Sequence, residues 1–552
     1  MSLQPQALYL VPEETARVAR AAFPKGNGYM QMYDELGLIY KNHQFATLFP
    51  RRGQPAEDPA RLALILVMQF AENVTDRQAA DAVRGRIDWK YALGLELTDP
   101  GFDFSVLSEF RKRLVEGGVE LLLLETLLTQ CKARGLLKAR GRQRTDSTAV
   151  FAAIRSLNRL ELVGETLRHT LERLAVLAPE WLQTVAVPDW FVRYGKRFDS
   201  YRLPKSEAER ETLAATIGAD GVTVLGAIDA PAAPPCVRDE PAVAILREVW
   251  QQQYEAPPDE PGGPVPWRKV AELPPPSDLI PSPYDPEARY GTKRETNWVG
   301  YKVHVTETCD PDTPHLITNV ETTVATTSDF VMLPTIHDHL AERKLLPEEH
   351  LVDAGYMSAD HVVTSQEDGI ELIGPVTVNR SWQAKAGQGF DGACFQIDWE
   401  HERVLCPQGK ASTRWRPWRD TRGKEIIQVT FAEQDCLACR ERAKCTRSTT
   451  RPREVSFRPR VEYEALTHAR ARQTTEDYKE RYAKRAGIEA TLAQGIAHGG
   501  LRQARYLGLA KTTLQEILMA VALNLVRLIA WWRETPRASI RRSHFATLAP
   551  SG

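Results

Sequence analysis

The stretch "HLVDAGYMSAD" (350–360) decides the fold assignment, because it joins an apolar strand directly to a carboxylate. Leu351 and Val352 are typical of the buried end of a strand, Asp353 follows at once, and Gly355 allows a sharp turn. In an open α/β sheet, ligands bind beyond the carboxyl ends of the strands. Asp353 is therefore a candidate site residue, and the alternative is that it caps the following helix.

The composition is that of a folded, soluble chain with several domains. Its 552 residues exceed one ordinary core, and 43% hydrophobic with 26% charged residues are typical of globular proteins. The net charge of −1 neither supports nor excludes nucleic-acid binding, because binding faces are local. The first residues lack a basic segment and a long apolar run, so we expect no signal peptide. We expect a cytoplasmic protein whose cysteines are reduced or metal-bound.

The most apolar long stretch is "LQEILMAVALNLVRLIAWW" (514–532). It contains Gln515, Glu516, Asn524 and Arg527, and a membrane span rarely carries that many polar groups. Its apolar residues recur at helical spacing, which favours an amphipathic helix that closes a core. We therefore expect no contact with a membrane.

Residues 1–135 predict an all-helical N-terminal domain, because their apolar residues recur at helical spacing. Asp58 is a plausible N-cap, with Pro59 at the first helical position. The basic side chains at 111–113 favour a DNA-binding module of the helix-turn-helix kind. The alternative is a helical bundle with a solvated basic face.

The pattern from residue 139 onward predicts a mixed α/β sheet with helices packed on it. The strand before Asp353 is joined by four further predicted strands and one amphipathic helix: 139–150, 297–308, 315–325 and 370–378, with the helix at 328–343. Residues 155–255 are mostly helical by pattern, and the proline-rich segment 256–288 predicts little packed structure.

Two further carboxylates raise the odds that Asp353 belongs to a site. Asp146 lies inside a predicted strand, where an acidic side chain is costly unless it binds something. Glu489 lies in a basic helical segment, residues 467–512, with nine Lys or Arg against four Asp or Glu. Mg²⁺ binds few carboxylates together with phosphate and water oxygens, and basic neighbours would hold a polyanion. The alternative for Glu489 is an internal salt bridge.

Together these residues resemble the DDE triad of insertion-sequence transposases. Asp146 stands in "RTDST", Asp353 in "VDAGY" and Glu489 on a late helix. The resemblance covers nearly the whole chain, 30–535. It implies an RNase H-like core in which the three carboxylates hold Mg²⁺ or Mn²⁺ for phosphodiester chemistry by a two-metal mechanism.

Smaller patterns agree with this family. Tyr482 and Arg485 precede Glu489 as in the family's Tyr-x2-Arg-x3-Glu pattern, and 290–305 and 502–515 resemble its flanking segments. The family often carries Lys seven positions after the Glu, whereas this chain has Ile496. A phosphate contact must then come from elsewhere. The candidates for DNA contact on this segment are Tyr482, Arg485, His498, Arg502, Arg505 and Lys511.

Four of the eight cysteines form a group with the spacing C-x29-C-x2-C-x5-C. A C-x2-C pair fits two positions of a tetrahedral zinc site, so the group predicts a structural Zn²⁺, with buried free thiols as the alternative. Its members are Cys406, Cys436, Cys439 and Cys445. Within the same segment, "STRWRPWRDTRGK" (412–424) interleaves Arg with Trp415 and Trp418. That pattern suits stacking on bases or phosphate contact, and ordinary surface packing is equally compatible.

The predicted fold is thus α/β mixed, with an RNase H-like core sheet, flanking helices, an all-helical N-terminal domain and a Cys-rich insertion. The predicted domains are a helical DNA-binding domain, the catalytic core with its helical and proline-rich insertion, the Cys-rich insertion, the C-terminal core helices and a tail: 1–135, 136–379 (insertion about 155–288), 380–473, 474–535 and 536–552.

The predicted function is a DNA transposase that cuts and joins phosphodiester bonds at insertion-sequence ends. Its partners would be element-end inverted repeats and target DNA, and the resemblance implies a nucleoid-associated homo-oligomer, at least a dimer, that holds two ends. The alternatives are an RNase H-like nuclease without strand transfer and an inactive, transposon-derived DNA-binding protein.

Overall fold

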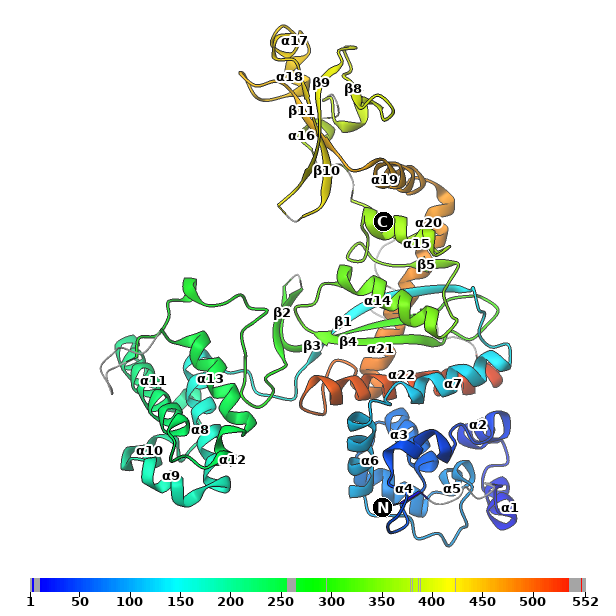
Figure 1. The fold of residues 1–552 in the computed structure, drawn as a ribbon. Helices are drawn as coiled ribbons and strands as arrows, with labels where there is room; N and C mark the ends of the chain where they lie inside the picture. Colours follow the sequence, from blue (N-terminus) through cyan, green and yellow to red (C-terminus); the bar gives the residue numbers. More distant parts are fainter. Residues whose placement is uncertain are drawn as a thin grey trace.

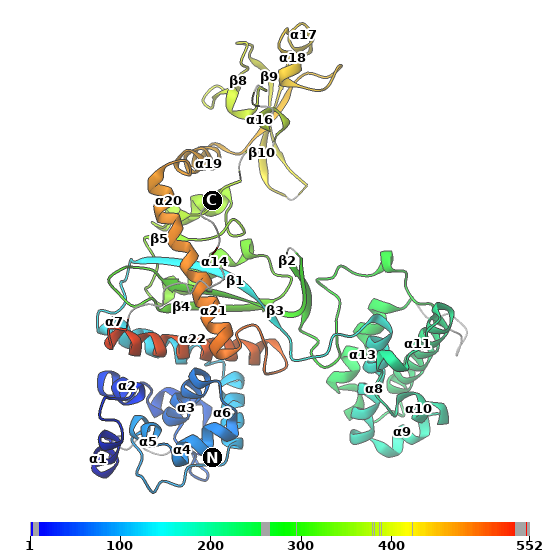
Figure 2. The same ribbon diagram turned by 180° about the vertical axis from the view of Figure 1, so that it is seen from behind.

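The computed structural model describes residues 2–3, 10–255, 265–293, 295–377, 379, 381–385, 387, 389–421, 423–535 and 548. Three regions are arranged around a central sheet (Figures 1 and 2). In Figure 1 the N-terminal helices lie below the sheet, a helical insertion lies to its left, and the Cys-rich lobe extends above it. The predicted tail, 536–552, falls almost entirely outside the described residues.

The central sheet is mixed, as the sequence predicts. Its strands are β1 (Arg142–Phe151), β2 (Arg289–Lys293), β3 (Thr296–Thr308), β4 (Ile317–Val324), β5 (Glu349–Leu351) and β6 (Glu371–Ile373). The order is β2-β3-β1-β5-β6, and β4 pairs with β3. β1 is antiparallel to β3 and parallel to β5. The short connection between β3 and β4 makes that pair antiparallel, and the β5 and β6 pair is parallel across a helix.

Helices cover both faces of this sheet, which confirms an RNase H-like core with flanking helices. α14 (Asp329–Glu342) lies in front of the sheet in Figure 1, and α21 (Gly487–Gly499) lies in front of it in Figure 2, after the half turn. α15 (Ala359–Glu367) connects β5 to β6. α21 contacts β1, and this contact brings the late helical segment against the first strand.

The N-terminal region is helical. It comprises α1 (Glu13–Ala22), α2 (Gly28–Leu36), α3 (Pro59–Glu72), α4 (Asp76–Gly85), α5 (Ile87–Leu93), α6 (Ser105–Glu116) and α7 (Leu122–Ala133), with the 3-10 helix η1 (Asn42–Leu48). α3 begins as predicted, because the Asp58 side chain accepts a hydrogen bond from the backbone N–H of Arg61 and Pro59 is its first residue.

The predicted apolar helix 514–532 is α22 (Leu509–Trp532), and it packs on α3 and β4. Two described helices, α11 (Glu207–Asp229) and α22, are long and apolar enough to cross a membrane. In α22, 72% of the most apolar 18-residue window is buried inside the protein. One continuous hydrophobic core joins the N-terminal helices, α22 and the central sheet. α22 is therefore a core helix.

The insertion between β1 and β2 has its own hydrophobic core. It consists of α8 (Arg159–Leu177), α9 (Pro179–Val185), α10 (Pro188–Tyr194), α11, α12 (Pro235–Arg238) and α13 (Pro241–Gln253), with 3-10 turns η2 (Ser200–Arg202) and η3 (Val270–Glu272). The expectation of little packed structure at 256–288 is wrong for its described part, because Val265 and Ile280 are buried in this core. Residues 256–264 lie outside the described residues.

The Cys-rich lobe contains a three-stranded and a two-stranded sheet. Its elements are α16 (Trp382–Lys385), η4 (Gly392–Cys394), β7 (Gln396–Asp398), β8 (Arg403–Leu405), β9 (Ser412–Arg419), β10 (Glu425–Phe431), α17 (Glu433–Leu437), α18 (Arg442–Cys445) and β11 (Glu454–Phe457). α19 (Arg460–Arg472), α20 (Glu476–Ala483) and η5 (Lys484–Ala486) then return the chain to α21 and the sheet.

Candidate active site

Register alone places the first two predicted carboxylates side by side. β1 pairs with β5 in parallel, and the last pair in that register is Arg144 with Leu351. Asp146 and Asp353 each stand two residues beyond that pair. β1 continues alongside β3, whereas β5 ends, so Asp146 borders the notch that β5 leaves open. The negative charge of Asp353 accordingly raises the pKa of Asp146.

Asp146 is a buried carboxylate with two polar contacts. Only 7% of the residue is exposed. One oxygen accepts a hydrogen bond from the Ser147 backbone N–H at 2.8 Å, and the other from the Arg485 guanidinium at 2.9 Å. Burial raises the pKa of Asp146, and the positive charges of Arg485 and Lys293 oppose this shift. A buried carboxylate of this kind needs a cation beside it.

Asp353 does not cap the following helix. The N-cap of α15 is Ser358, whose hydroxyl accepts the backbone N–H of His361 at 3.0 Å. The Asp353 carboxylate instead accepts the N–H of Gly355 at 2.8 Å, which fixes the turn after β5. The helix-cap alternative is therefore excluded, and the second oxygen of Asp353 stays available to a ligand.

Glu489 lies in the first turn of α21, and Arg485 connects it to Asp146. The Arg485 guanidinium contacts Glu489 at 3.3 Å while it donates to Asp146. The Glu489 side chain is 67% exposed, whereas that of Arg485 is only 14% exposed. One cation thus joins residues 146 and 489, which are far apart in sequence, and the negative charge of Asp353 acts on the same guanidinium.

A fourth carboxylate at the site was not predicted from the sequence. Asp329 opens α14, and its carboxylate accepts hydrogen bonds from Ser147 at 3.0 Å and from Lys302 at 3.1 Å. A Cβ atom built on Gly355 would lie 3.0 Å from an oxygen of Asp353 and 3.2 Å from one of Asp329. The glycine therefore allows these two carboxylates to flank one turn. In the sequence, Asp329 resembles any acidic residue in a first helical turn.

Lys293, at the end of β2, is a second residue that the sequence did not single out. Its ammonium lies 3.3 Å from the Ser147 hydroxyl and 3.8 Å from Asp329. Its side chain is 43% exposed, whereas that of Lys302 is 11% exposed and donates to the Thr327 carbonyl at 2.6 Å. Lys302 is thus held in place below the surface, and Lys293 is the more exposed of the two lysines.

The other predicted DNA contacts lie in different surroundings. Arg502 is exposed and donates to the Thr148 hydroxyl at 2.9 Å, on the same strand as Asp146. Arg505 donates to the Asn73 side chain and lies over the Phe70 ring, 4.5 Å from its centroid, so it joins this segment to α3. Lys511 is exposed at the start of α22.

Tyr482 stacks on Tyr478 with ring centroids 5.6 Å apart. Burial raises the pKa of Tyr482, and the charges of Asp353, Asp146 and Glu489 raise it further while Arg485 lowers it. The Tyr-x2-Arg-x3-Glu pattern therefore places Tyr482 and Arg485 close enough to the three acidic side chains for the charges to act on them.

A buried ion network holds the Glu489 helix on the sheet. Glu307 on β3 is fully buried and accepts hydrogen bonds from Arg144 at 2.7 Å, from Arg527 at 2.7 Å and from Thr491 at 2.6 Å. Arg144 also donates to the carbonyl of Lys484, in the turn before Arg485. A Cβ atom on Gly487 would lie 2.0 Å from the Arg144 guanidinium, so a larger residue there would force that guanidinium to shift.

The basic side chains at 111–113 are engaged within the N-terminal helices. Arg111 is 8% exposed and donates to Asp76 at 2.9 Å, and Arg113 pairs with Glu109 at 2.7 Å. Lys112 lies 3.6 Å from Glu116. The interpretation of Arg111 as part of a basic DNA-binding face is wrong, because Arg111 is buried and forms an ion pair with Asp76.

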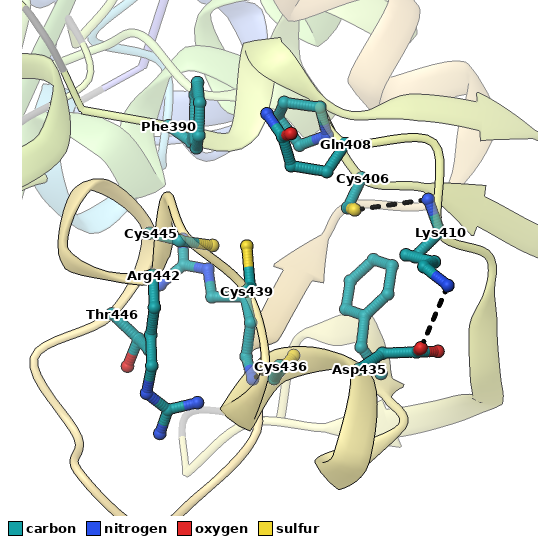
Figure 3. Close-up of a pocket in the computed structure, with 13 residues that line it drawn as sticks. Phe390, Cys406, Gln408, Lys410, Asp435, Cys436, Cys439, Arg442, Cys445 and Thr446 are labelled. Atoms are coloured by element: carbon teal, nitrogen blue, oxygen red, sulfur yellow. Dashed lines mark hydrogen bonds and ion pairs between the residues drawn. The ribbon is translucent and has the colours of Figure 1, made fainter.

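The four grouped cysteines line one cavity in the lobe, together with Phe390 and Arg453. In Figure 3 the side chains of Cys439, Cys445 and Cys406 point toward the space between them, and Cys436 lies below. Burial raises the pKa of Cys445 to about 11, and the charges of the three other thiolates act in the same direction. Within the described part of the chain, no three His, Cys, Asp or Glu side chains converge closely enough to hold a metal ion.

The central sheet and the candidate site together define the class of protein. It has an RNase H-like fold, with acidic side chains at the edge where β1 continues past the end of β5. Comparison with known families is more specific. A family described as "Transposase DDE domain" matches residues 405–529, and a "Transposase domain (DUF772)" matches residues 19–113. No curated protein matches the chain. The two family matches indicate a DDE transposase of the insertion-sequence kind. The DDE match contains Glu489 and the four grouped cysteines, whereas Asp146 and Asp353 precede it.

Proposed function

We propose that the protein is a DNA transposase that cuts phosphodiester bonds at the ends of its element and joins the freed ends to target DNA. The observation that carries the proposal is the ion pairing of Arg485 with both Asp146 and Glu489, while strand register places Asp353 beside Asp146. Arg485 supplies positive charge between two of the carboxylates, and a bound metal ion would draw the three acidic side chains closer together than they lie in the structure. Oxygen donors of this kind suit Mg²⁺ or Mn²⁺.

Asp146, Asp353 and Glu489 would hold the metal ions. Two such ions supply activation of the attacking oxygen and stabilisation of the leaving oxygen in an in-line displacement. Strand cleavage and strand joining are both displacements at phosphorus, so one acidic site serves both. Arg485 would neutralise the carboxylates until the metal binds.

The exposed basic side chains around the carboxylates would bind DNA phosphates. Lys293 on one side of the notch, and Arg502 and Lys511 on the other segment, have exposed side chains. Lys293 takes the place of the lysine that the family often carries where this chain has Ile496. Arg485, Arg505 and Tyr482 would act by holding the active-site helix and its carboxylates in position. The proposed assembly is at least a dimer, because two element ends must be joined together.

We also infer that the four grouped cysteines hold a structural zinc ion. Four thiols from one short lobe line one cavity, and thiolate sulfur is the ligand that Zn²⁺ prefers in closed structural sites. The zinc would draw the four sulfurs closer together than they lie in the structure and so fix the loops that carry them, and it would take no part in the displacement.

The proposal is tested with purified protein, Mn²⁺ or Mg²⁺, and a labelled duplex that ends in the terminal repeat of its own element. Wild-type protein should release a 3′-hydroxyl end and join it to a plasmid. Asp146→Asn, Asp353→Asn and Glu489→Gln should each abolish both products and keep DNA binding. Glu476→Gln is the matched control, since this side chain is 82% exposed and, among the residues that the structure describes, forms an ion pair with Lys479 alone.

Three results would change the proposal. Cleavage without joined product would identify a nuclease of the same fold. DNA binding without cleavage by the wild-type protein would identify a DNA-binding protein without activity. Full cleavage by one of the three carboxylate variants would remove that residue from the site.

A further inference from the structure

The Cys-rich lobe is strongly basic, although the chain as a whole is nearly neutral. Residues 401–460 contain 15 Lys or Arg and 7 Asp or Glu, an excess of eight positive charges, whereas the whole chain has a net charge of −1. The zinc site proposed above does not explain this excess. A lobe with so much charge of one sign is suited to a polyanion.

The two faces of β9 differ in character. Side chains alternate along a strand, and Trp415 faces the lobe's hydrophobic core, opposite the fully buried Val429 of β10. Arg414, Arg416 and Trp418 therefore share the other face, and all three are exposed. β9 is also an edge strand, because the sheet order is β11-β10-β9.

Within the described part of the chain, the arginines of this outer face form no ion pairs. Among the residues that the structure describes, neither Arg414 nor Arg416 lies within 4 Å of a carboxylate, whereas Arg403 and Arg419 in the same lobe both form ion pairs. The Arg416 guanidinium lies over the Trp418 ring, 4.7 Å from its centroid. This contact orients the arginine and leaves its N–H donors in solvent. Trp418 is 48% exposed.

The turn between β9 and β10 contacts the catalytic core. Lys424 pairs with Asp360 of α15 at 3.2 Å and lies 5.0 Å from the centre of the Phe330 ring. Phe330 is the neighbour of Asp329 at the active site, and α15 follows Asp353. Figures 1 and 2 show the paired strands extending from the outer end of the lobe toward the sheet. The outer face of β9 thus leads along the lobe toward the carboxylates.

We propose that Arg414, Arg416 and Trp418 form a second DNA-contacting surface, which binds the phosphate backbone of duplex DNA on its way to the active site. The inference rests on the proposed function and names a contact outside the catalytic notch. Alternate residues of a strand are about 6.8 Å apart. This spacing lets Arg414 and Arg416 reach neighbouring phosphates along one DNA strand. Contact with the backbone makes this binding independent of base sequence.

The test measures affinity for a duplex without the element's terminal repeat, over a range of salt concentrations. The variants are Arg414→Gln, Arg416→Gln, their double variant, and the charge-preserving pair Arg414→Lys with Arg416→Lys. Each lost contact should lower the slope of log K against log salt by about 0.9, and the lysine pair should keep the wild-type slope. Trp418→Ala should weaken binding through the loss of Arg416 orientation.

Arg403→Gln is the matched control, because Arg403 lies in the same lobe and pairs with Asp398 at 3.0 Å. It should leave the slope unchanged. Unaltered melting temperatures of the Gln variants show that the lobe is folded. An unchanged slope and affinity in the double variant, with normal DNA binding by the wild-type protein, would overturn the inference. No DNA binding by the wild-type protein at any salt concentration would overturn the proposed function as well.

Discussion

The Arg485 guanidinium donates to the Asp146 carboxylate at 2.9 Å, although 338 residues separate the two in the sequence. The side chains are 14% and 10% exposed, so this is a nearly buried ion pair. The same guanidinium contacts Glu489, and its charge, together with that of Lys293, opposes the rise that burial causes in the pKa of Asp146. In the absence of metal, Arg485 is therefore expected to stabilise the acidic side chains by partly compensating their negative charge.

Arg485→Ala is expected to destabilise the protein and to increase its stabilisation by divalent metal. Removing one partner of a buried pair costs about 3 kcal/mol, because the other charge is left buried. A metal ion supplies the missing positive charge, so Mn²⁺ should raise the melting temperature of the variant more than that of the wild type. Lys479→Ala is the control, since its pair with Glu476 is exposed. Equal stabilisation of both proteins by Mn²⁺ would refute the prediction.

Glu307→Gln is expected to lower stability by about 3–5 kcal/mol at neutral pH, since it leaves Arg144 and Arg527 without their buried partner. The charges of both arginines lower the pKa of Glu307 in the folded protein and outweigh its burial. A lowered pKa contributes stability above the unfolded value, and this contribution is lost as the pH falls through the folded pKa. Urea unfolding at a series of pH values should therefore show a difference that shrinks in acid. A constant difference would contradict this explanation.

Glu516→Gln is expected to have the opposite effect. Glu516 on α22 is fully buried, its one oxygen accepts from Gln515 at 3.2 Å, and its other oxygen has no partner among the described residues. Burial raises its pKa well above the ordinary value. A raised pKa costs stability above the folded pKa, and this cost is relieved as the pH falls toward the unfolded value, about 4.3.

The glutamine variant should thus be more stable than the wild type at neutral pH, by about 1–3 kcal/mol. The gain should disappear below about pH 4, where the carboxyl is neutral in both folded and unfolded chains. The same urea series that tests Glu307→Gln measures it, so each variant is the other's control. A loss of stability at neutral pH would show that Glu516 is ionised and paired in solution.

Much of the core could be predicted because the local signals and the final structure agree. Alternating β-branched residues predicted the bounds of β3 and β4 to within two residues. The Asp58–Pro59 pair predicted the start of α3. The convergence of Asp146 with Asp353 follows from the parallel register of two neighbouring strands. That register requires only the strand order of an RNase H-like sheet.

The remaining site residues depend on tertiary contacts that no local pattern encodes. Asp329 and Lys293 reach the notch only because α14 and β2 pack beside Ser147. Arg111 is followed by two basic residues and is typical of an exposed position in the sequence. In the structure it is buried, because it pairs with Asp76 on another helix. Arg505, predicted to contact DNA, in fact donates to Asn73, which lies 432 positions earlier in the sequence.

The last prediction concerns the cysteine cavity, where metal binding and packing of free thiols give different results. If zinc closes the cavity, purified protein should contain about one zinc ion per chain, and Cys436→Ser should lose it. Cys236→Ser is the control, because Cys236 is an exposed free thiol on α12, outside the lobe. A chelator should lower the melting temperature of the wild type and leave that of Cys436→Ser unchanged. Metal-free protein with a normal melting temperature would show instead that the four thiols pack as ordinary side chains, and the lobe would then rest on its hydrophobic core of Phe395, Val429 and Phe457.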